Sequence, residues 1–147
     1  MNMTEGHRRN ISSTFWLLDK TLCEFGQWAE GRACKSVLYE EVNNLSVAQR
    51  AKLLSHIDSL RSCLREAREA LGMSPHTIDA ARSIRVGATG MWIDLVEMGA
   101  KHLRGFGEVP PELMEFLDPL VERMQAGVQG IFDVVNGGPA DPGGNLI

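Results

Sequence analysis

Apolar residues recur along most of this chain at alternating spacings of three and four, and an α-helix places residues with that spacing on one face. The first such stripe lies within residues 10–30 and consists of Ile11, Phe15, Leu18, Leu22, Phe25 and Ala29. The second stripe consists of Leu53, Ile57, Leu60, Leu64, Ala67 and Leu71. No segment fits the period of two that is typical of a half-buried strand. The spacing therefore predicts an all-α fold.

Capping residues predict where the first two helices end and where the second begins. Gly31 and Gly72 directly follow the two stripes, and glycine tolerates the left-handed conformation that closes a helix. Ser46 and Gln49 have the spacing of a capping box, in which two side chains satisfy backbone donors at a helix start. The second long helix is therefore expected to run from Ser46 to Gly72.

A third helix is predicted to start at Pro75, with Ser74 as its cap, and to run to Gly105. Val86 and Ile93 fall roughly opposite its main stripe at 100° per residue, so its middle is apolar nearly all round. Its main stripe consists of Ala81, Ala88, Trp92, Leu95, Gly99 and Phe106. A helix of this kind is either central in its own domain or covered by another subunit.

The last helical region is predicted to open at Pro110 and Pro111 and to carry one apolar stripe, which consists of Leu113, Leu117, Leu120, Met124, Ile131 and Val134. Asp118 and Pro119 are expected to break it, because proline inside a helix lacks one hydrogen bond and clashes with the preceding turn. A shorter helical piece is expected between the first two helices, where Leu38 and Val42 lie four residues apart.

These elements predict an antiparallel bundle of four main helices plus one short helix. The length of 147 residues suits one globular domain, expected over residues 1–136. Residues 137–147 are rich in glycine and proline and are expected to form a flexible tail.

Charge, hydropathy and cysteine usage exclude several classes of function. The net charge of −4 shows no basic excess, which argues against nucleic-acid binding. No apolar run has the length of a signal peptide core or a membrane span, so we expect no membrane association. Three cysteines without a CxxC pair indicate free thiols and a cytoplasmic protein.

Motifs that carry chemistry are absent from the sequence. There is no E-x-x-H pair, no H-E-x-x-H and no zinc-type cluster of cysteine and histidine, so no metal site is expected. GxxxxGK[ST] and GxSxG are missing as well. We therefore expect no cofactor, assign no catalytic residue and favour a non-enzymatic role, although the sequence leaves enzymatic activity open.

Arg61, Arg65 and Arg68 follow helical spacing and form a basic ridge beside the second stripe. Such a ridge could bind a phosphate-bearing ligand or an acidic partner surface. Alternatively, it pairs with local acids such as Asp58 and Glu69, or with the acidic last third of the same chain.

Arg85 and His102 are strongly polar side chains within the apolar arc of the third helix. Together with Trp92 they could line a pocket between helices, which would indicate a small-molecule-binding protein or an enzyme. The alternative is structural, because buried charge is costly unless it is paired. In that case we expect Arg85 to pair with a carboxylate on another helix and His102 to lie partly exposed near the end of the bundle.

The leading hypothesis from sequence is a non-enzymatic interaction or regulatory protein that acts as a homodimer or binds another protein. Helices one and three carry more apolar surface than one face of a bundle needs, and aromatic residues are favoured at interface cores. The candidate interface residues are Trp16, Leu17, Trp28, Val86 and Ile93.

Overall fold

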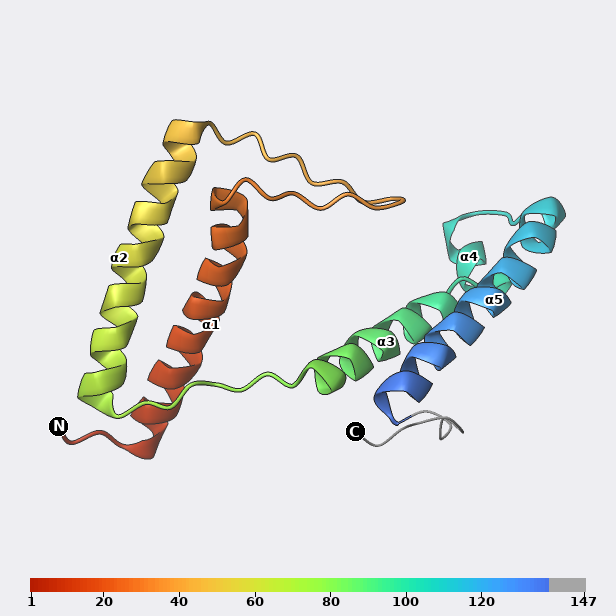
Figure 1. Cartoon of the computed structure of the whole chain (residues 1–147). Helices are drawn as coiled ribbons and strands as arrows, with labels where there is room; N and C mark the ends of the chain where they lie inside the picture. The colour runs from red at the N-terminus through yellow and green to blue at the C-terminus, as the bar shows by residue number, and fades with distance from the viewer. Residues whose placement is uncertain (138–147) are drawn as a thin grey trace, which may run out of the picture. The chain divides into compact units, whose positions relative to one another are not determined.

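The computed structural model describes residues 1–137, and this part of the chain is all-α, which confirms the predicted fold class (Figure 1). The helices are α1 (Glu5–Ala29), α2 (Val47–Leu71), α3 (Ala80–Val96), α4 (Ala100–Leu103) and α5 (Pro111–Val135), with a 3₁₀ turn, η1, at Arg104–Phe106. They belong to two compact units, Met1–His76 and the chain from Thr77 onward, each with one antiparallel helix pair. The four-helix bundle and the single 1–136 domain stay predictions, and the tail expected over residues 137–147 lies, from residue 138 on, outside the described residues.

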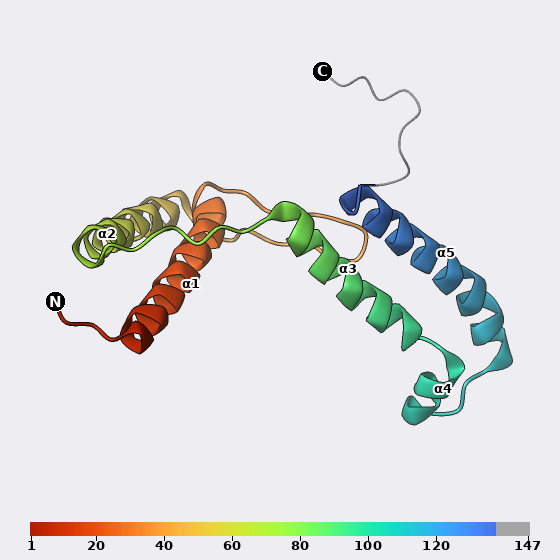
Figure 2. The same cartoon turned by 90° about the horizontal axis from the view of Figure 1, so that it is seen from below.

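The first pair consists of α1 and α2, which lie side by side in both views (Figures 1 and 2). Its core is thin. Leu22, Ala29 and Ile57 are buried, and Ile57 is only 1% exposed. Half-buried leucines of α2 pack against these three residues. Apolar burial on one face of each helix is therefore the main force that joins the two helices.

Helix ends in this pair follow their capping residues closely. Ser46 and Gln49 form the predicted capping box, and Gly72 adopts the left-handed conformation after α2, at φ 60°. α1 begins at Glu5, earlier than its apolar stripe indicates. The reason is Thr4, whose hydroxyl accepts a hydrogen bond from the His7 amide at 3.1 Å and so caps an additional turn.

The second pair consists of α3 and α5, which pack around the buried Ala88 and Val128. The prediction for the start of α3 at Ser74 and Pro75 is wrong. Asp79 caps the helix instead, since its carboxylate accepts a hydrogen bond from the Arg82 amide at 3.2 Å.

The predicted continuation of the third helix to Gly105 is also wrong. α3 ends at Val96, and Gly99 has an extended backbone, at ψ 157°, which is incompatible with a continuous helix. The short α4 and the 3₁₀ turn η1 follow instead. His102 therefore lies on a separate short helix, away from the seam of α3.

The predicted break at Asp118 and Pro119 is wrong as well, because α5 runs through Pro119 without interruption. Proline removes one backbone donor, which would otherwise bond the carbonyl of Glu115. Leu117 and Val121, on either side of it, are both partly buried. We attribute the continuity of α5 to packing on both sides of the proline, which offsets the missing bond.

The segment between α1 and α2 is extended, and the helical piece expected at Leu38 and Val42 is absent. Residues 34–41 form a two-armed projection, which we call the finger, with an isolated β-bridge between Lys35 and Glu40 (Figure 1). A single apolar pair four residues apart is too little to nucleate a helix, since the first turn fixes several residues for one hydrogen bond.

Candidate interaction surfaces

The structure does not gather Arg85, Trp92 and His102 into a pocket. Arg85 donates from Nη1 to the carbonyl oxygen of Val135 at 3.4 Å, so its expected carboxylate partner is replaced by a backbone carbonyl. Trp92 on α3 is 36% exposed. His102 on α4 is also exposed, as expected if its role is structural. A shallow hollow in the other unit lies near Arg8 and Leu71, and it encloses no room for a water molecule.

Arginines lie at the C-terminal ends of neighbouring helices in both pairs. Arg8 on α1 donates a hydrogen bond to the Leu71 carbonyl, at the end of α2, at 2.7 Å. Arg85 on α3 likewise donates to the Val135 carbonyl, at the end of α5. The guanidinium of Arg50 fills the space beside Gly31, just past the end of α1. α1 and α5 have no basic residue in their own last turns, so the antiparallel neighbour supplies the cation that the helix dipole favours there. These arginines therefore have structural roles.

The basic ridge is divided by the packing of α2 on α1. Arg61 is half-buried at the helix interface, with Nη2 3.9 Å from the Sγ of Cys23, whereas Arg65 and Arg68 are exposed. The ion pairs of the described residues join Arg9 to Glu5, Arg32 to Glu30 and Lys35 to Glu40. None of these pairs includes the ridge, so the expected pairing with Asp58 and Glu69 does not occur in the described part of the chain.

Four of the five candidate interface residues are accessible. Leu17, Trp28, Val86 and Ile93 are all exposed by 40% or more. Trp16 is only half-buried, but its ring stacks on His76, with ring centroids 4.2 Å apart and planes 16° apart. Trp16 therefore already has an aromatic partner within its own unit.

Helical geometry places the exposed apolar residues of α1 and α2 on one face of the pair. With α1 and α2 antiparallel and turning 100° per residue, the flanks that carry Phe25 and Leu60 point to the same side. Lys52 lies at the outer edge of this side on α2, as Leu17 does on α1, and no Asp, Glu, Lys or Arg lies closer around the helix to Phe25 or Leu60. We call this surface the α1–α2 apolar face and define it as Leu17, Leu18, Phe25, Trp28 and Leu60.

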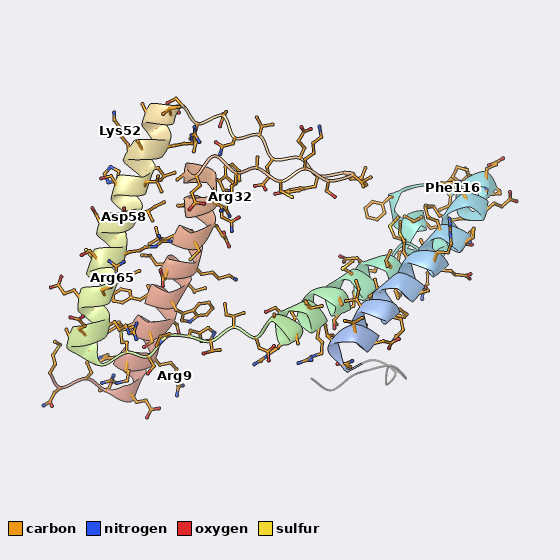
Figure 3. The ribbon with its side chains drawn as sticks, viewed as in Figure 1. Arg9, Arg32, Lys52, Asp58, Arg65 and Phe116 are labelled. Carbon is orange, nitrogen blue, oxygen red and sulfur yellow. The ribbon has the colours of Figure 1, made fainter. Side chains whose placement is uncertain are left out.

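The α3–α5 pair has a comparable surface. The α3–α5 apolar face consists of the exposed Ile84, Met91, Met124 and Ile131 and the half-buried Leu120, and Asp94 lies at its edge, three residues from Met91 on α3. At 100° per residue, Val86 and Ile93 lie on the opposite flank of α3, on the side where α5 carries acidic residues such as Asp118 and Glu122. Phe116, which lies near the start of α5 (Figure 3), is also exposed.

Within the described residues, no three His, Cys, Asp or Glu side chains are placed to hold a metal ion together. None of the described helices has the length and apolar character required to cross a membrane. No family model matches the chain, and no significantly similar curated protein or solved structure was found.

Proposed function

We propose that this chain is a non-enzymatic interaction protein that acts as a homodimer through the α1–α2 apolar face. The observation that carries the proposal is the composition of that face. Phe25 is 49% exposed, Trp28 40% and Leu60 43%, and no charged residue lies among them. Contiguous exposed apolar surface rimmed by polar residues is typical of protein–protein interfaces.

The thin core of the pair supports this proposal. Amphipathic helices gain most of their stability from burying an apolar face, and this pair buries few large side chains internally. Phe25 and Trp28 add aromatic anchors, which dominate the binding energy of many interfaces. A partner on this face would remove from water the apolar area that the pair leaves exposed.

A second copy suits the face because a two-fold axis brings identical surfaces together. On an uncharged face this symmetry creates no like-charge contact. The charged residues Asp58 and Arg65 lie on the opposite flank of α2, away from such an axis. The unpaired thiols of Cys23, Cys34 and Cys63 suit a reducing compartment such as the cytoplasm, which we propose as the site of action.

Two variants on α2 test the proposed interface. Leu60→Glu places a charge on the α1–α2 apolar face, and Ser62→Glu places the same charge on the exposed polar side two residues further along. We expect Leu60→Glu to sediment as a folded monomer and Ser62→Glu to remain a dimer, with helical circular dichroism unchanged in both. Equal behaviour of the two variants would contradict this interface.

The α3 surface predicted from sequence provides a second test. Ile93→Asp changes the flank that carries Val86 and Ile93, and we expect this variant to remain a dimer. Dissociation by Ile93→Asp, with Leu60→Glu still dimeric, would move the interface to α3. No specific observation favours the small-molecule alternative at Arg85, Trp92 and His102.

A further inference from the structure

A second stripe of side chains runs along α3, on the flank opposite to the α3–α5 apolar face. It consists of Val86, Thr89, Ile93 and Val96, which fall within one arc of the helix at 100° per residue. Val86 is 68% exposed, Ile93 52% and Val96 50%. The hydroxyl of Thr89 already donates to the Arg85 carbonyl at 2.8 Å. We call these four residues the outer stripe.

The spacing of the outer stripe is that of a seam between two helices. Its members are separated by three, four and three residues, the pattern by which side chains of one helix fill the holes of a facing helix. The other stripe of α3, which contains Ala88 and Leu95, is covered by α5 within the same unit. The outer stripe has no such cover in the described part of the unit, so it can accept a helix from outside.

Acidic residues of α5 border the outer stripe on the same side of the helix pair. Asp118, Glu122 and Asp133 lie on that flank of α5 at 100° per residue, and all three are exposed. Because α3 and α5 are antiparallel and Arg85 reaches Val135, Asp133 lies level with the start of the outer stripe and Glu122 level with its end. A helix on the outer stripe would therefore have carboxylates along one side.

The charges of these carboxylates are not neutralised within the described residues. The ion pairs among those residues all lie in the Met1–His76 unit. Asp133 accepts a hydrogen bond from Nε2 of Gln129 at 3.1 Å, but this donor is neutral and leaves the negative charge in place. Arg82, near the start of α3, lies on the same side of the pair and forms no ion pair in the described chain. The flank therefore combines exposed apolar area with unneutralised negative charge.

This charge restricts what can cover the outer stripe. A two-fold contact with the same flank of a second copy would bring the acidic residues of the two α5 helices together, and like charges repel. Nucleic acid and anionic lipid surfaces would be repelled for the same reason. A helix that carries basic side chains beside an apolar stripe matches both features of the flank.

We propose that the outer stripe and the neighbouring carboxylates of α5 bind a basic amphipathic helix of a partner protein. The apolar side of that helix packs on Val86, Ile93 and Val96, and its Lys or Arg side chains lie beside Glu122 and Asp133. Apolar burial supplies affinity, while the ion pairs set the orientation and the choice of partner. The contact uses the surface of one unit, and it does not depend on the homodimer proposed at the α1–α2 apolar face.

Titration of the full chain with a synthetic helix tests the proposal. The probe is a fluorescein-labelled peptide of about three heptads, with leucine along one stripe and arginine along one flank of that stripe. The control peptide has glutamate in place of every arginine. We expect fluorescence anisotropy to show at least about 10-fold tighter binding of the arginine peptide, and added salt should reduce the difference. Equal affinities of the two peptides would contradict the proposal.

Paired variants locate the binding site. Ile93→Ala removes apolar area from the outer stripe and should weaken binding of the arginine peptide by about 10-fold, whereas Met91→Ala, on the opposite flank, should leave it unchanged. Glu122→Gln should weaken binding by about 2- to 5-fold, whereas Asp94→Asn, which lies near Met91, should not. All four side chains are exposed, so we expect helical circular dichroism to be unchanged in each variant.

Methyl resonances of the unmodified chain give a readout that needs no variant. On addition of the arginine peptide, we expect the methyl signals of Val86, Ile93 and Val96 to shift and those of Ile84 and Ile131, on the α3–α5 apolar face, to stay in place. Shifts confined to Ile84 and Ile131 would overturn the proposal. The same loss of affinity in all four variants would overturn it as well, since binding would then not depend on the outer stripe.

Discussion

The guanidinium of Arg85 on α3 donates a hydrogen bond to the carbonyl oxygen of Val135, in the last turn of α5, at 3.4 Å. The contact joins the two helices of the pair and places a positive charge at the negative end of the α5 dipole. It explains why a charged residue lies on the partly buried seam of α3 without a carboxylate partner.

Replacing Arg85 should therefore have a modest effect on stability. Arg85→Met keeps an apolar stem and loses the hydrogen bond, so we expect the free energy of unfolding to fall by about 0.5–1.5 kcal/mol. Arg82→Met is the matched control, since the bond described for Arg82 comes from its backbone amide. Urea denaturation at fixed protein concentration measures both, and a loss of several kcal/mol for Arg85→Met would indicate a larger role for this side chain.

Replacing Pro119 should raise the stability of the protein, whereas replacing Arg85 should lower it. Because α5 continues through it, Pro119→Ala restores an amide donor for the Glu115 carbonyl, and we expect it to stabilise the protein by at least about 1 kcal/mol. Pro111→Ala is the control, because proline at the first helical position costs little. Thermal unfolding should show a higher Tm for Pro119→Ala only. Equal shifts in the two variants would contradict the role assigned to the missing bond.

The capping box at the start of α2 can be tested directly. Ser46 accepts a hydrogen bond from the Gln49 amide at 3.1 Å, and Gln49 accepts one from the Ser46 amide at 2.8 Å. We expect Ser46→Ala to lower the free energy of unfolding by about 1 kcal/mol. Ser62→Ala, within the same helix, should be neutral or slightly stabilising, because alanine is the better helix former. Chemical denaturation of the two variants makes the comparison.

Ile57 carries much of the small core of the α1–α2 pair. Since it is 1% exposed, Ile57→Ala should destabilise the protein by about 2–5 kcal/mol through lost burial and a cavity. Val47→Ala, at a largely exposed position of the same helix, should change stability by less than about 0.5 kcal/mol. Similar losses in both variants would mean that the core lies elsewhere.

Much of the fold was predictable because local rules determine it. The stripe that contains Ile57 and the capping box at Ser46 correctly predicted a long second helix, since period and capping act within a few residues. The same rules failed at Pro119 and at Asp79. At Pro119 the outcome depends on packing between α3 and α5. At Asp79 it depends on competition between two possible capping residues, Ser74 and Asp79.

The candidate surfaces were less predictable. The sequence pattern assigned Leu120, Met124 and Ile131 to the buried stripe of the last helix, but the structure buries Val128 at the centre of the seam. Val121, Val128 and Val135, seven residues apart, carried that signal in the sequence. The finger tip had no comparable signal, because its exposure follows from backbone pairing between its two arms.

Sedimentation equilibrium of the unmodified chain over a range of micromolar concentrations tests the central claim most directly. We propose that a second copy of the chain covers the α1–α2 apolar face, where Phe25 and Leu60 are exposed. The account predicts a concentration-dependent equilibrium between one and two copies, with the dimer dominant at the upper end of the range. A single species with the mass of one chain at every concentration would contradict it.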